Sequence, residues 1–248
     1  MSLRLRLLAF LGGLTLAAIA SPAFAQSVTF DLGQGGGSVT GRIVQLLVLL
    51  TVLSLAPAIL VTVTSFTRIV IVLSFLRNAI GIQQTPPNTV MVSLALFLTG
   101  FIMAPTLQKA YQDGIAPLID DKISESEAFT RTVAPLEKFM LAHARTQDVD
   151  LFGNLAKIPK EEEAKDVPLR VLVPAFMISE LRRAFEIGFL LYLPFLIIDI
   201  VVASILMSMG MMMLPPGMVS LPFKLIFFVL VDGWYLIAGS LVQSFGTG

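Results

Sequence analysis

Four long apolar stretches limit what this chain of 248 residues can fold into. They cover residues 43–66, 89–106, 184–210 and 218–245; the first two contain no charged side chain and the last two contain two each. A helix needs about 20 predominantly apolar residues to cross a bilayer. We therefore predict an all-α, membrane-associated protein. Its first hydrophobic helical hairpin covers 43–106, with a kink at Pro57 and a turn near 83–87, and its second covers 184–248.

The overall composition agrees with this class and excludes several others. Hydrophobic residues make up 56% of the chain and charged residues 14%, and 17 basic residues balance 17 acidic ones. Without a basic excess, a nucleic-acid partner is not expected. The absence of cysteine excludes disulfides, iron–sulfur clusters and Cys-ligated zinc, and a single histidine excludes a multi-histidine metal site. We therefore expect no cofactor, no metal and no catalytic residues.

The first residues have the pattern of a secretory signal peptide. Arg4 and Arg6 precede an apolar run over residues 7–19, and Ala23-Phe24-Ala25 matches the small-x-small cleavage pattern. The alternative, a first transmembrane helix, needs a longer run. We predict that residues 1–25 are removed and that the Gly-rich residues 26–42 form a flexible N-terminal segment.

Residues 107–183 differ sharply from the rest of the chain. They contain 11 of the 17 basic and 13 of the 17 acidic residues. Ser124 and Glu127 have capping-box spacing, and His143 follows Phe139 at helical spacing, which favours a packed histidine over a catalytic one. We predict a small hydrophilic domain of two or three short helices, in which the charged run 160–165 is a solvated loop.

Ionisable residues within the apolar stretches are costly unless they are paired or face a wet cavity. Glu186 and Lys224 lie where they can reach an interface, whereas Asp199 and Asp232 have apolar residues on both sides. We predict that a set of four charges forms pairs within and between subunits. These buried charge or assembly residues are Arg68, Glu186, Asp199 and Asp232.

Methionine is concentrated at one point in the chain. Six of the 11 methionines lie in MSMGMMMLPPGM, residues 207–218, where glycine and proline must break a helix. Methionine is a flexible gap-filler in ordinary cores. Its density here instead favours a pore gasket in which several copies point their side chains at one axis: Met209, Met211, Met212 and Met213.

Four segments together resemble one protein family. They are TSFTRIVIVLSFLRNAIGIQQTPPN (64–88), PAFMISELRRAFEIGF (174–189), PFLIIDIVVASILMSMGMMMLPP (194–216) and LPFKLIFFVLVDGW (221–234). The sequence resembles the FliP family of flagellar type III secretion export-gate proteins over nearly the whole mature chain. Injectisome counterparts are similar too, but they usually lack the cleaved leader.

The resemblance implies a core subunit of a protein export gate at the centre of the flagellar basal body. In the family, several copies, a pentamer, combine with FliQ and FliR among other export-apparatus and basal-body ring proteins, and unfolded rod, hook and filament subunits pass through. Family members belong to the bacterial inner membrane, which makes residues 107–183 a periplasmic domain. Their helical hairpins pack in an assembly largely raised out of the bilayer. The resemblance therefore replaces the four spans that hydropathy alone suggests.

Three residues are predicted at subunit contacts of the hydrophilic domain: Phe139, Phe152 and Glu180. Glu180 lies within the family-like segment 174–189. Its simplest alternative partner is Arg183, within the same helix.

Two other functions remain as alternatives. A small-solute or ion transporter would explain charges at membrane depth, but it requires two half-chain repeats around a midplane site. An intramembrane enzyme would need a catalytic pair, which Asp199 and Asp232 could imitate, although their neighbours are mainly aliphatic.

Overall fold

The computed structural model describes residues 39–82, 84–158, 167–211 and 213–246, and every regular element in these ranges is a helix. The predicted all-α class is therefore confirmed. The chain divides into two units, Met1–Thr51 and Val52–Gly248. The N-terminal part of helix α2 (Val39–Val63) belongs to the first unit, and the other helices of the described ranges belong to the second. The predicted signal peptide and residues 26–38 lie outside the described residues.

The chain bends by 68° where α2 ends and α3 (Phe66–Ile80) begins. Pro57 lies inside α2, so this large bend is not at the proline. Two threonine hydroxyls bind the backbone groups that the break releases: Thr64 Oγ1 donates to the Leu60 carbonyl at 2.5 Å, and Thr67 Oγ1 donates to the Val61 carbonyl at 2.6 Å. Local side-chain hydrogen bonds of this kind replace the helix's own bonds at a sharp bend.

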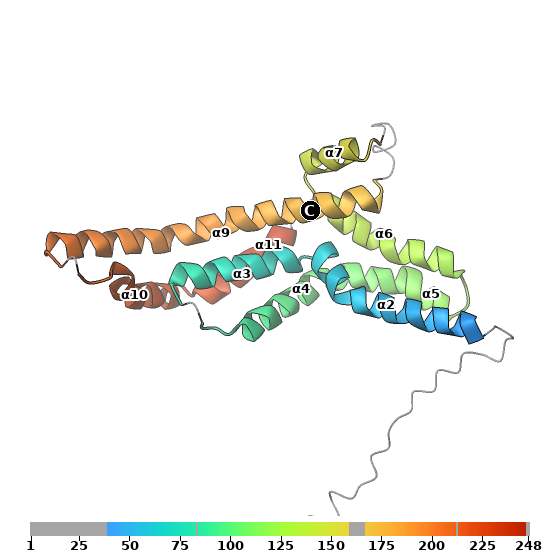
Figure 1. Cartoon of the computed structure of the whole chain (residues 1–248), viewed down its shortest axis with the longest axis horizontal. Coiled ribbons are helices and arrows are strands. Elements are labelled where there is room, and N and C mark those ends of the chain that lie inside the picture. Colours follow the sequence, from blue (N-terminus) through green and yellow to red (C-terminus); the bar gives the residue numbers. More distant parts are fainter. Residues whose placement is uncertain (1–38, 83, 159–166, 212, 247–248) are drawn as a thin grey trace, which may run out of the picture. The chain divides into compact units, whose positions relative to one another are not determined.

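The core of the second unit lies where α3 runs alongside α9 (Leu169–Ser208), as Figure 1 shows. Ile69, Val72 and Leu76 of α3 are fully buried. A Cβ built at Gly188 of α9 would lie 2.5 Å from the ring atom Cδ2 of Phe75. The two helices approach this closely because residue 188 has no side chain.

A second layer of helices starts after the loop that contains Pro86 and Pro87. Helix α4 (Asn88–Ala110) continues through a π-helical turn, η1 (Tyr111–Ile115), into the short α5 (Ala116–Ile119). Helix α6 (Glu125–His143) then runs back against α4 and η1. The predicted cap at its start is present: Ser124 Oγ accepts the Glu127 backbone N–H at 3.3 Å.

Three further helices complete the described part of the second unit. Helix α7 (Thr146–Leu155) contacts α9. Helices α10 (Pro216–Leu230) and α11 (Gly233–Gly246) follow each other and meet at a bend of 62°. Helix α9 has 40 residues and runs without interruption through the expected domain boundary between residues 183 and 184. The change in composition there marks a change of surroundings along one helix.

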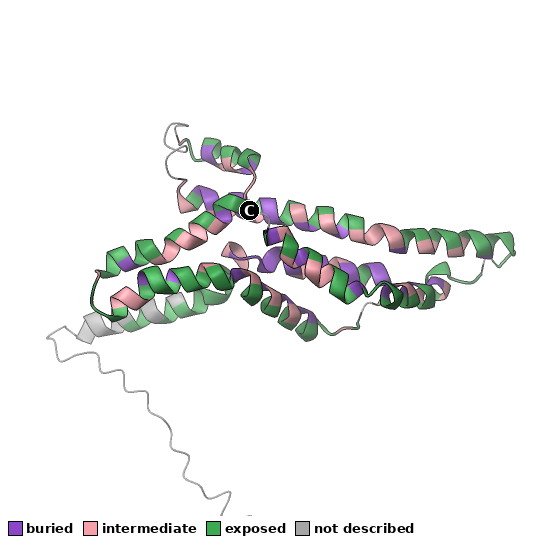
Figure 2. Ribbon diagram, turned by 180° about the vertical axis from the view of Figure 1, so that it is seen from behind, coloured by how far each residue is buried: buried purple, intermediate pink, exposed green. Residues whose placement is uncertain are grey.

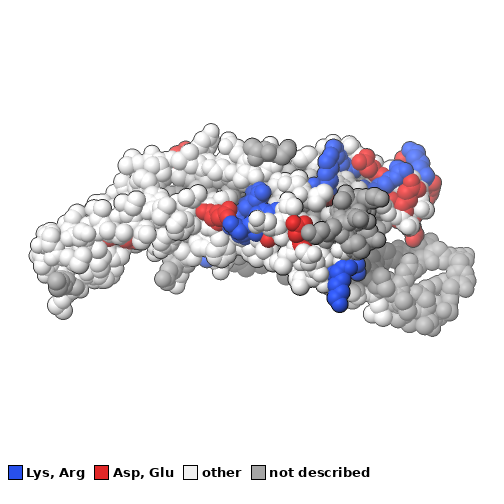
Figure 3. Space-filling model, turned by 90° about the horizontal axis from the view of Figure 1, so that it is seen from above, with Lys and Arg blue, Asp and Glu red and all other residues white. Residues whose placement is uncertain are grey.

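Much apolar surface of these helices is not covered within the chain. Among the described residues, two helical stretches, Asn88–Ile119 and Leu169–Ser208, are long and apolar enough to cross a membrane, or up to four if each bent pair is one span. Only 22% and 11% of their most apolar windows are buried. Figure 2 shows that the C-terminal half of α9 is largely exposed, and Figure 3 shows that the end of the molecule formed by this half is almost free of charged side chains.

Candidate functional site: buried charges and a methionine-bearing turn

A buried ion pair joins α3 to α9. Arg68 and Glu180 have side chains that are 1% and 0% exposed. Arg68 Nε donates to Glu180 Oε2 at 2.9 Å, and Nη2 donates to Oε1. Two parallel bonds from one guanidinium to the two oxygens of one carboxylate, a bidentate contact, fix the orientation of both groups.

The same guanidinium also reaches the last helix. Arg68 Nη1 donates to Ser244 Oγ at 2.9 Å and to the Ser244 carbonyl at 3.3 Å, and its central carbon lies 3.7 Å from the centre of the Phe245 ring. One side chain therefore holds α3, α9 and α11 together. Because the pair is dry, removing either partner would leave the other charge buried and unpaired.

The structure places Glu180 inside the subunit. Its ion-pair partner is Arg68, 112 positions away in the sequence, rather than the neighbouring Arg183. No surface remains on the Glu180 side chain for another subunit in this conformation, because the side chain is completely covered.

A second polar network joins α9, α10 and α3. Lys224 Nζ donates to Asp199 Oδ2 at 2.6 Å and to the Ala79 carbonyl at 3.1 Å, and the Ser220 hydroxyl donates to Asp199 Oδ1 at 2.5 Å. The Lys224 side chain is 7% exposed and that of Asp199 is 31% exposed. Lys224 therefore packs inside the subunit, whereas one side of Asp199 remains accessible.

Lys224 and Ser220 belong to this network although they are not among the charge-pair residues predicted from the sequence. They are four residues apart, so they lie on one face of α10, and that spacing was the available indication.

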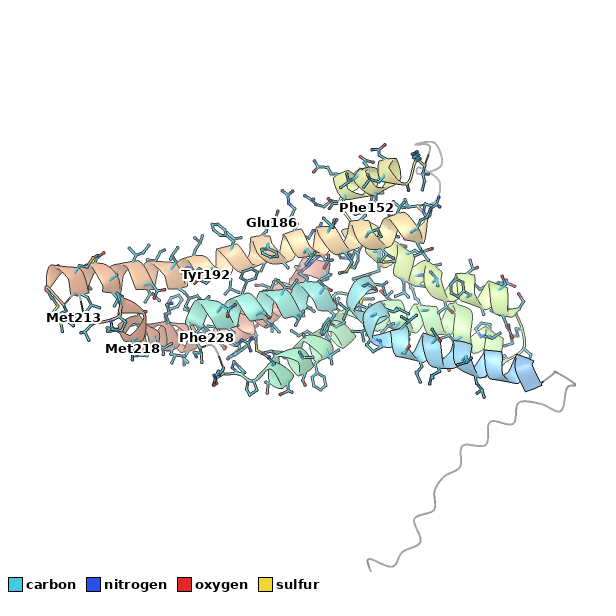
Figure 4. All side chains as sticks on the ribbon, in the orientation of Figure 1. Phe152, Glu186, Tyr192, Met213, Met218 and Phe228 are labelled. Carbon is cyan, nitrogen blue, oxygen red and sulfur yellow. The ribbon has the colours of Figure 1, made fainter. Side chains whose placement is uncertain are left out.

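The other two predicted charges lie at the surface. Glu186 is 58% exposed and pairs with Arg182 one turn earlier, at 2.8 Å (Figure 4). Asp232 is exposed at the bend between α10 and α11 in a left-handed backbone conformation, with φ of 49°. Its side chain forms no ion pair with the part of the chain that the structure describes.

The two predicted contact phenylalanines have different surroundings. Phe139 of α6 is partly buried, with its ring centre 5.9 Å from that of Phe176 and 6.1 Å from that of Phe245. Phe152 of α7 is also partly buried and lies on the helix that packs against α9 (Figure 4).

Helix α7 is attached to α9 by a polar contact that the sequence did not indicate. Asp148 accepts hydrogen bonds from Arg145 Nε at 2.9 Å and Nη2 at 2.7 Å, and from the Ser179 hydroxyl at 2.5 Å. The bond from Arg145 is the main reason that the pKa of Asp148 lies below its usual value; burial opposes this shift and the Ser179 bond adds to it.

The methionine-bearing segment is the turn between α9 and α10. The Gly210 N–H binds the Met207 carbonyl at 3.1 Å and the Met211 N–H binds the Leu206 carbonyl at 2.9 Å, while Gly210 has φ of 75°. This pair of bonds is a Schellman motif, which ends helices at a left-handed glycine. Glycine therefore fixes where α9 stops.

The side chains at this turn point away from the subunit. Met209, Met211 and Met213 are 66%, 41% and 99% exposed, and Figure 4 shows Met213 at the tip that joins the two helices. Met212 lies outside the described residues. Such exposed methionines do not serve as core filler in this chain, and they form an apolar projection that can contact another molecule.

In the described ranges, no group of three or more histidine, aspartate or glutamate side chains could hold a metal ion.

Comparison with known proteins agrees with the resemblance seen in the sequence. The profile of the FliP family matches residues 49–241. Proteins named flagellar biosynthetic protein FliP are similar in Caulobacter vibrioides (58% identity, covering 99% of this chain and 92% of the relative), Bacillus subtilis (60%, 82% and 91%) and Aquifex aeolicus (52%, 90% and 93%). These matches confirm the resemblance, and the chain belongs to the FliP family.

Proposed function

We propose that this chain is a core subunit of the flagellar type III protein export gate, and that it forms part of the protein-conducting channel for unfolded rod, hook and filament subunits. The observation that carries the proposal is the identity of 51–60% to proteins named flagellar biosynthetic protein FliP over most of the chain. Its partners are further copies of itself, five in the family, together with FliQ, FliR, and other export-apparatus and basal-body ring proteins.

The exposed apolar surface supports a role within a larger assembly. Phe97, Phe101, Val229 and Leu230 are 78%, 70%, 74% and 79% exposed in the single chain. Large apolar patches on a protein mark contact with partners or lipid. We infer an inner-membrane location within the basal body, with the hydrophilic residues 107–183 on the periplasmic side after removal of a leader over 1–25.

The methionines of the turn are proposed as the seal of the channel. Met209, Met211, Met212 and Met213 of several copies would meet at one axis. A ring of flexible apolar side chains excludes water and ions by dewetting while the pore is idle. It also adapts to varied passing polypeptides, because methionine is unbranched and its sulfur is polarizable.

The charged residues divide into two proposed roles. Arg68 and Asp199 hold each subunit together through the pairs described above. Glu186 and Asp232 are exposed in the single chain and are therefore available to neighbouring subunits. Phe139 and Phe152 are proposed at contacts of the hydrophilic domain, whereas Glu180 would affect assembly through the fold of its own subunit.

The proposal is tested by deleting the gene and examining the flagellum. Loss of every external part, from rod to filament, with recovery on complementation, is expected. An ordinary filament on the deletion strain would exclude the gate. Co-purification from membranes followed by mass measurement would then identify partners and copy number, and a lone chain without apolar partners would contradict the assembly.

The seal is tested separately with Met211, Met212 and Met213 changed together to alanine. At matched complex levels, we expect cells to become sensitive to ions and their membranes to conduct. Met177→Ala, a methionine in the first half of α9, is the control for loss of a thioether elsewhere. A tight membrane in the triple variant would remove the seal from the proposal.

A further inference from the structure

Two charged side chains of the hydrophobic hairpins have no partner of opposite charge within the single chain. The first hairpin, 43–106, contains two charged residues and the second, 184–248, contains four. Four of these six belong to the ion pairs described above. The other two, Arg77 and Asp232, form no ion pair with a described residue. Each copy of the chain therefore contributes one cation and one anion without a counter-charge.

Arg77 lines a cavity of about 250 Å³ between α3, the loop after it and the helices α10 and α11. The other lining residues are mainly apolar and include Phe228. Arg77 Nη1 donates to the Pro86 carbonyl at 3.4 Å and to Asn88 Oδ1, which are both neutral acceptors. Its Nε is shielded from solvent and has no acceptor among the described residues. A guanidinium in such surroundings favours a carboxylate as a further partner.

The size of this cavity limits what can enter it. Ligand pockets for small molecules start near about 300 Å³, and this cavity is smaller. It therefore suits one inserted side chain better than a separate ligand.

Asp232 lies at the bend between α10 and α11, among exposed apolar side chains. Val229, Leu230 and Tyr235 near it are all exposed. An apolar patch of this kind marks a contact with another molecule, and a carboxylate that is covered together with the patch needs a cation. A purely local role is the alternative, because aspartate tolerates the left-handed backbone of this bend. That role requires no charge, since asparagine tolerates the same conformation.

The two unpaired charges lie at the same end of the subunit. Val229 and Trp234, on either side of Asp232 in the sequence, both line the cavity of Arg77. Figure 4 shows Phe228, another lining residue, where α10 lies beside α3. Identical copies in a closed assembly are related by rotation about an axis. Residues that are neighbours within one copy therefore lie at similar heights along that axis, and they can meet across a contact between copies.

We propose that Asp232 of one copy pairs with Arg77 of a neighbouring copy, with its carboxylate in the cavity beside Phe228. Charge complementarity favours a second copy as the partner, because every copy supplies both groups in equal number. The proposal rests on the self-association in the proposed function. The two fail differently: without self-association the purified particles contain one copy, whereas without this pair they contain several copies that Asp232→Asn does not weaken.

A zero-length cross-link tests whether the pair joins two copies. A carbodiimide couples a lysine amine to a carboxylate that touches it. One copy carries R77K with D232N, and it is expressed together with an unchanged copy that has a different tag. A bond between residues 77 and 232 can then form only between copies. We expect this bond in the peptide masses of particles purified from membranes, and its absence would overturn the proposal.

The reverse arrangement tests for a pair within one chain. A small minority of copies carries R77K alone, and all other copies carry D232N, so the bond can form only inside a single copy. We expect no bond. A bond in this arrangement and not in the first would assign the pair to one subunit and overturn the proposal. A cross-link from residue 77 to another protein would assign the cavity to that protein instead.

Asp232→Asn in every copy tests the charge while it keeps a residue that tolerates the bend. We expect the association of copies to weaken about 30-fold or more, since losing one partner of a covered interfacial pair has an effect of this size. The measurement is the fraction of multi-copy particles after dilution in detergent, by mass photometry. Asp121→Asn is the matched control, because Asp121 is also exposed and left-handed, with φ of 55°. Equal dissociation of these two variants would refute the proposal.

A double-variant comparison tests whether the two residues act on each other. Arg77→Gln should also weaken the association, and R77Q with D232N should weaken it no more than the stronger of the single changes, because both remove the same contact. Effects that multiply would show two separate contributions and would overturn the pair. Helix content by circular dichroism checks that each variant is folded.

Discussion

The buried pair of Arg68 and Glu180 gives the sharpest prediction for the stability of the single subunit. Glu180→Gln removes the negative charge while it nearly preserves the side-chain shape. Two charge-assisted hydrogen bonds from Arg68 are affected, each contributing about 1.5–3 kcal/mol. Breaking a buried ion pair by changing one partner costs about 3–5 kcal/mol.

The expected cost is in the lower part of this range because Arg68 keeps other contacts. Its bonds to Ser244 and its position over the Phe245 ring remain. We therefore expect a loss of about 3–4 kcal/mol in the free energy of unfolding, or about 150- to 900-fold in the unfolding equilibrium.

The measurement is unfolding of the isolated chain in mixed micelles by increasing dodecyl sulfate, followed by circular dichroism and by fluorescence of Trp234, the single tryptophan. Glu186→Gln is the control, since it removes an acidic partner from a pair in which both side chains are more than half exposed. Such a pair contributes less than about 1 kcal/mol.

A double replacement, Arg68→Met with Glu180→Leu, tests the cause. It removes both charges, so no ion is left unpaired, and it should recover at least half of the loss. The reasoning is refuted if Glu180→Gln and Glu186→Gln unfold at the same dodecyl sulfate fraction. It is also refuted if the double variant is no more stable than Glu180→Gln.

Three further predictions concern other contacts of the second unit. Lys224→Met should cost about 1–2 kcal/mol in the same unfolding assay, less than a fully buried charge because Asp199 is 31% exposed and keeps contact with solvent; an unchanged midpoint would argue against the pair. Gly188→Val should cost at least about 1–3 kcal/mol, because its Cβ would lie 2.5 Å from a phenylalanine ring; Gly100→Ala, with nothing within 4 Å, is the control, and equal midpoints would contradict the close approach. The lowered pKa of Asp148 means that its contribution to stability is present above about pH 3.9 and is lost as the pH falls further. The protection of the α7 amides against hydrogen exchange, relative to their intrinsic exchange rates, should therefore fall in acid, and Asp148→Asn should remove that pH dependence.

The ends of several helices follow directly from the sequence. α4 starts immediately after Pro87, and α9 stops just before Gly210. Glycine and proline act on the backbone of their immediate neighbours, so their effect can be predicted without knowledge of tertiary contacts.

Other features depend on contacts between distant residues. The bend at Thr64 and Ser65 contains neither glycine nor proline, and threonine hydroxyls stabilise it. Threonine also makes such bonds inside an uninterrupted part of a helix, as Thr51 does, so its presence alone does not predict a bend. The partner of Glu180 could not be read from the sequence, because Arg183 lies much nearer along the chain, about one turn later in the same helix. Only the packing of α3 against α9 brings Arg68 to the carboxylate.

The sequence also did not indicate which of the charged side chains in the apolar stretches are exposed. Asp199 and Asp232 both have apolar neighbours in sequence, yet one is paired with Lys224 and the other lies at an exposed bend. Hydropathy describes the average surroundings of a segment and does not tell which face of a helix its neighbours cover.

The uninterrupted length of α9 has a consequence for its position in a membrane. Forty residues at about 1.5 Å each give a helix about 60 Å long, twice the hydrocarbon thickness of about 30 Å. Even a tilt of about 40° leaves a projection of about 46 Å along the bilayer normal. A bilayer that holds the exposed C-terminal half therefore leaves the N-terminal half beyond the lipid tails, where several of its apolar side chains are already buried among helices of the same chain. One continuous helix thus joins a half that is covered within the subunit to a half that is open to lipid or to other subunits.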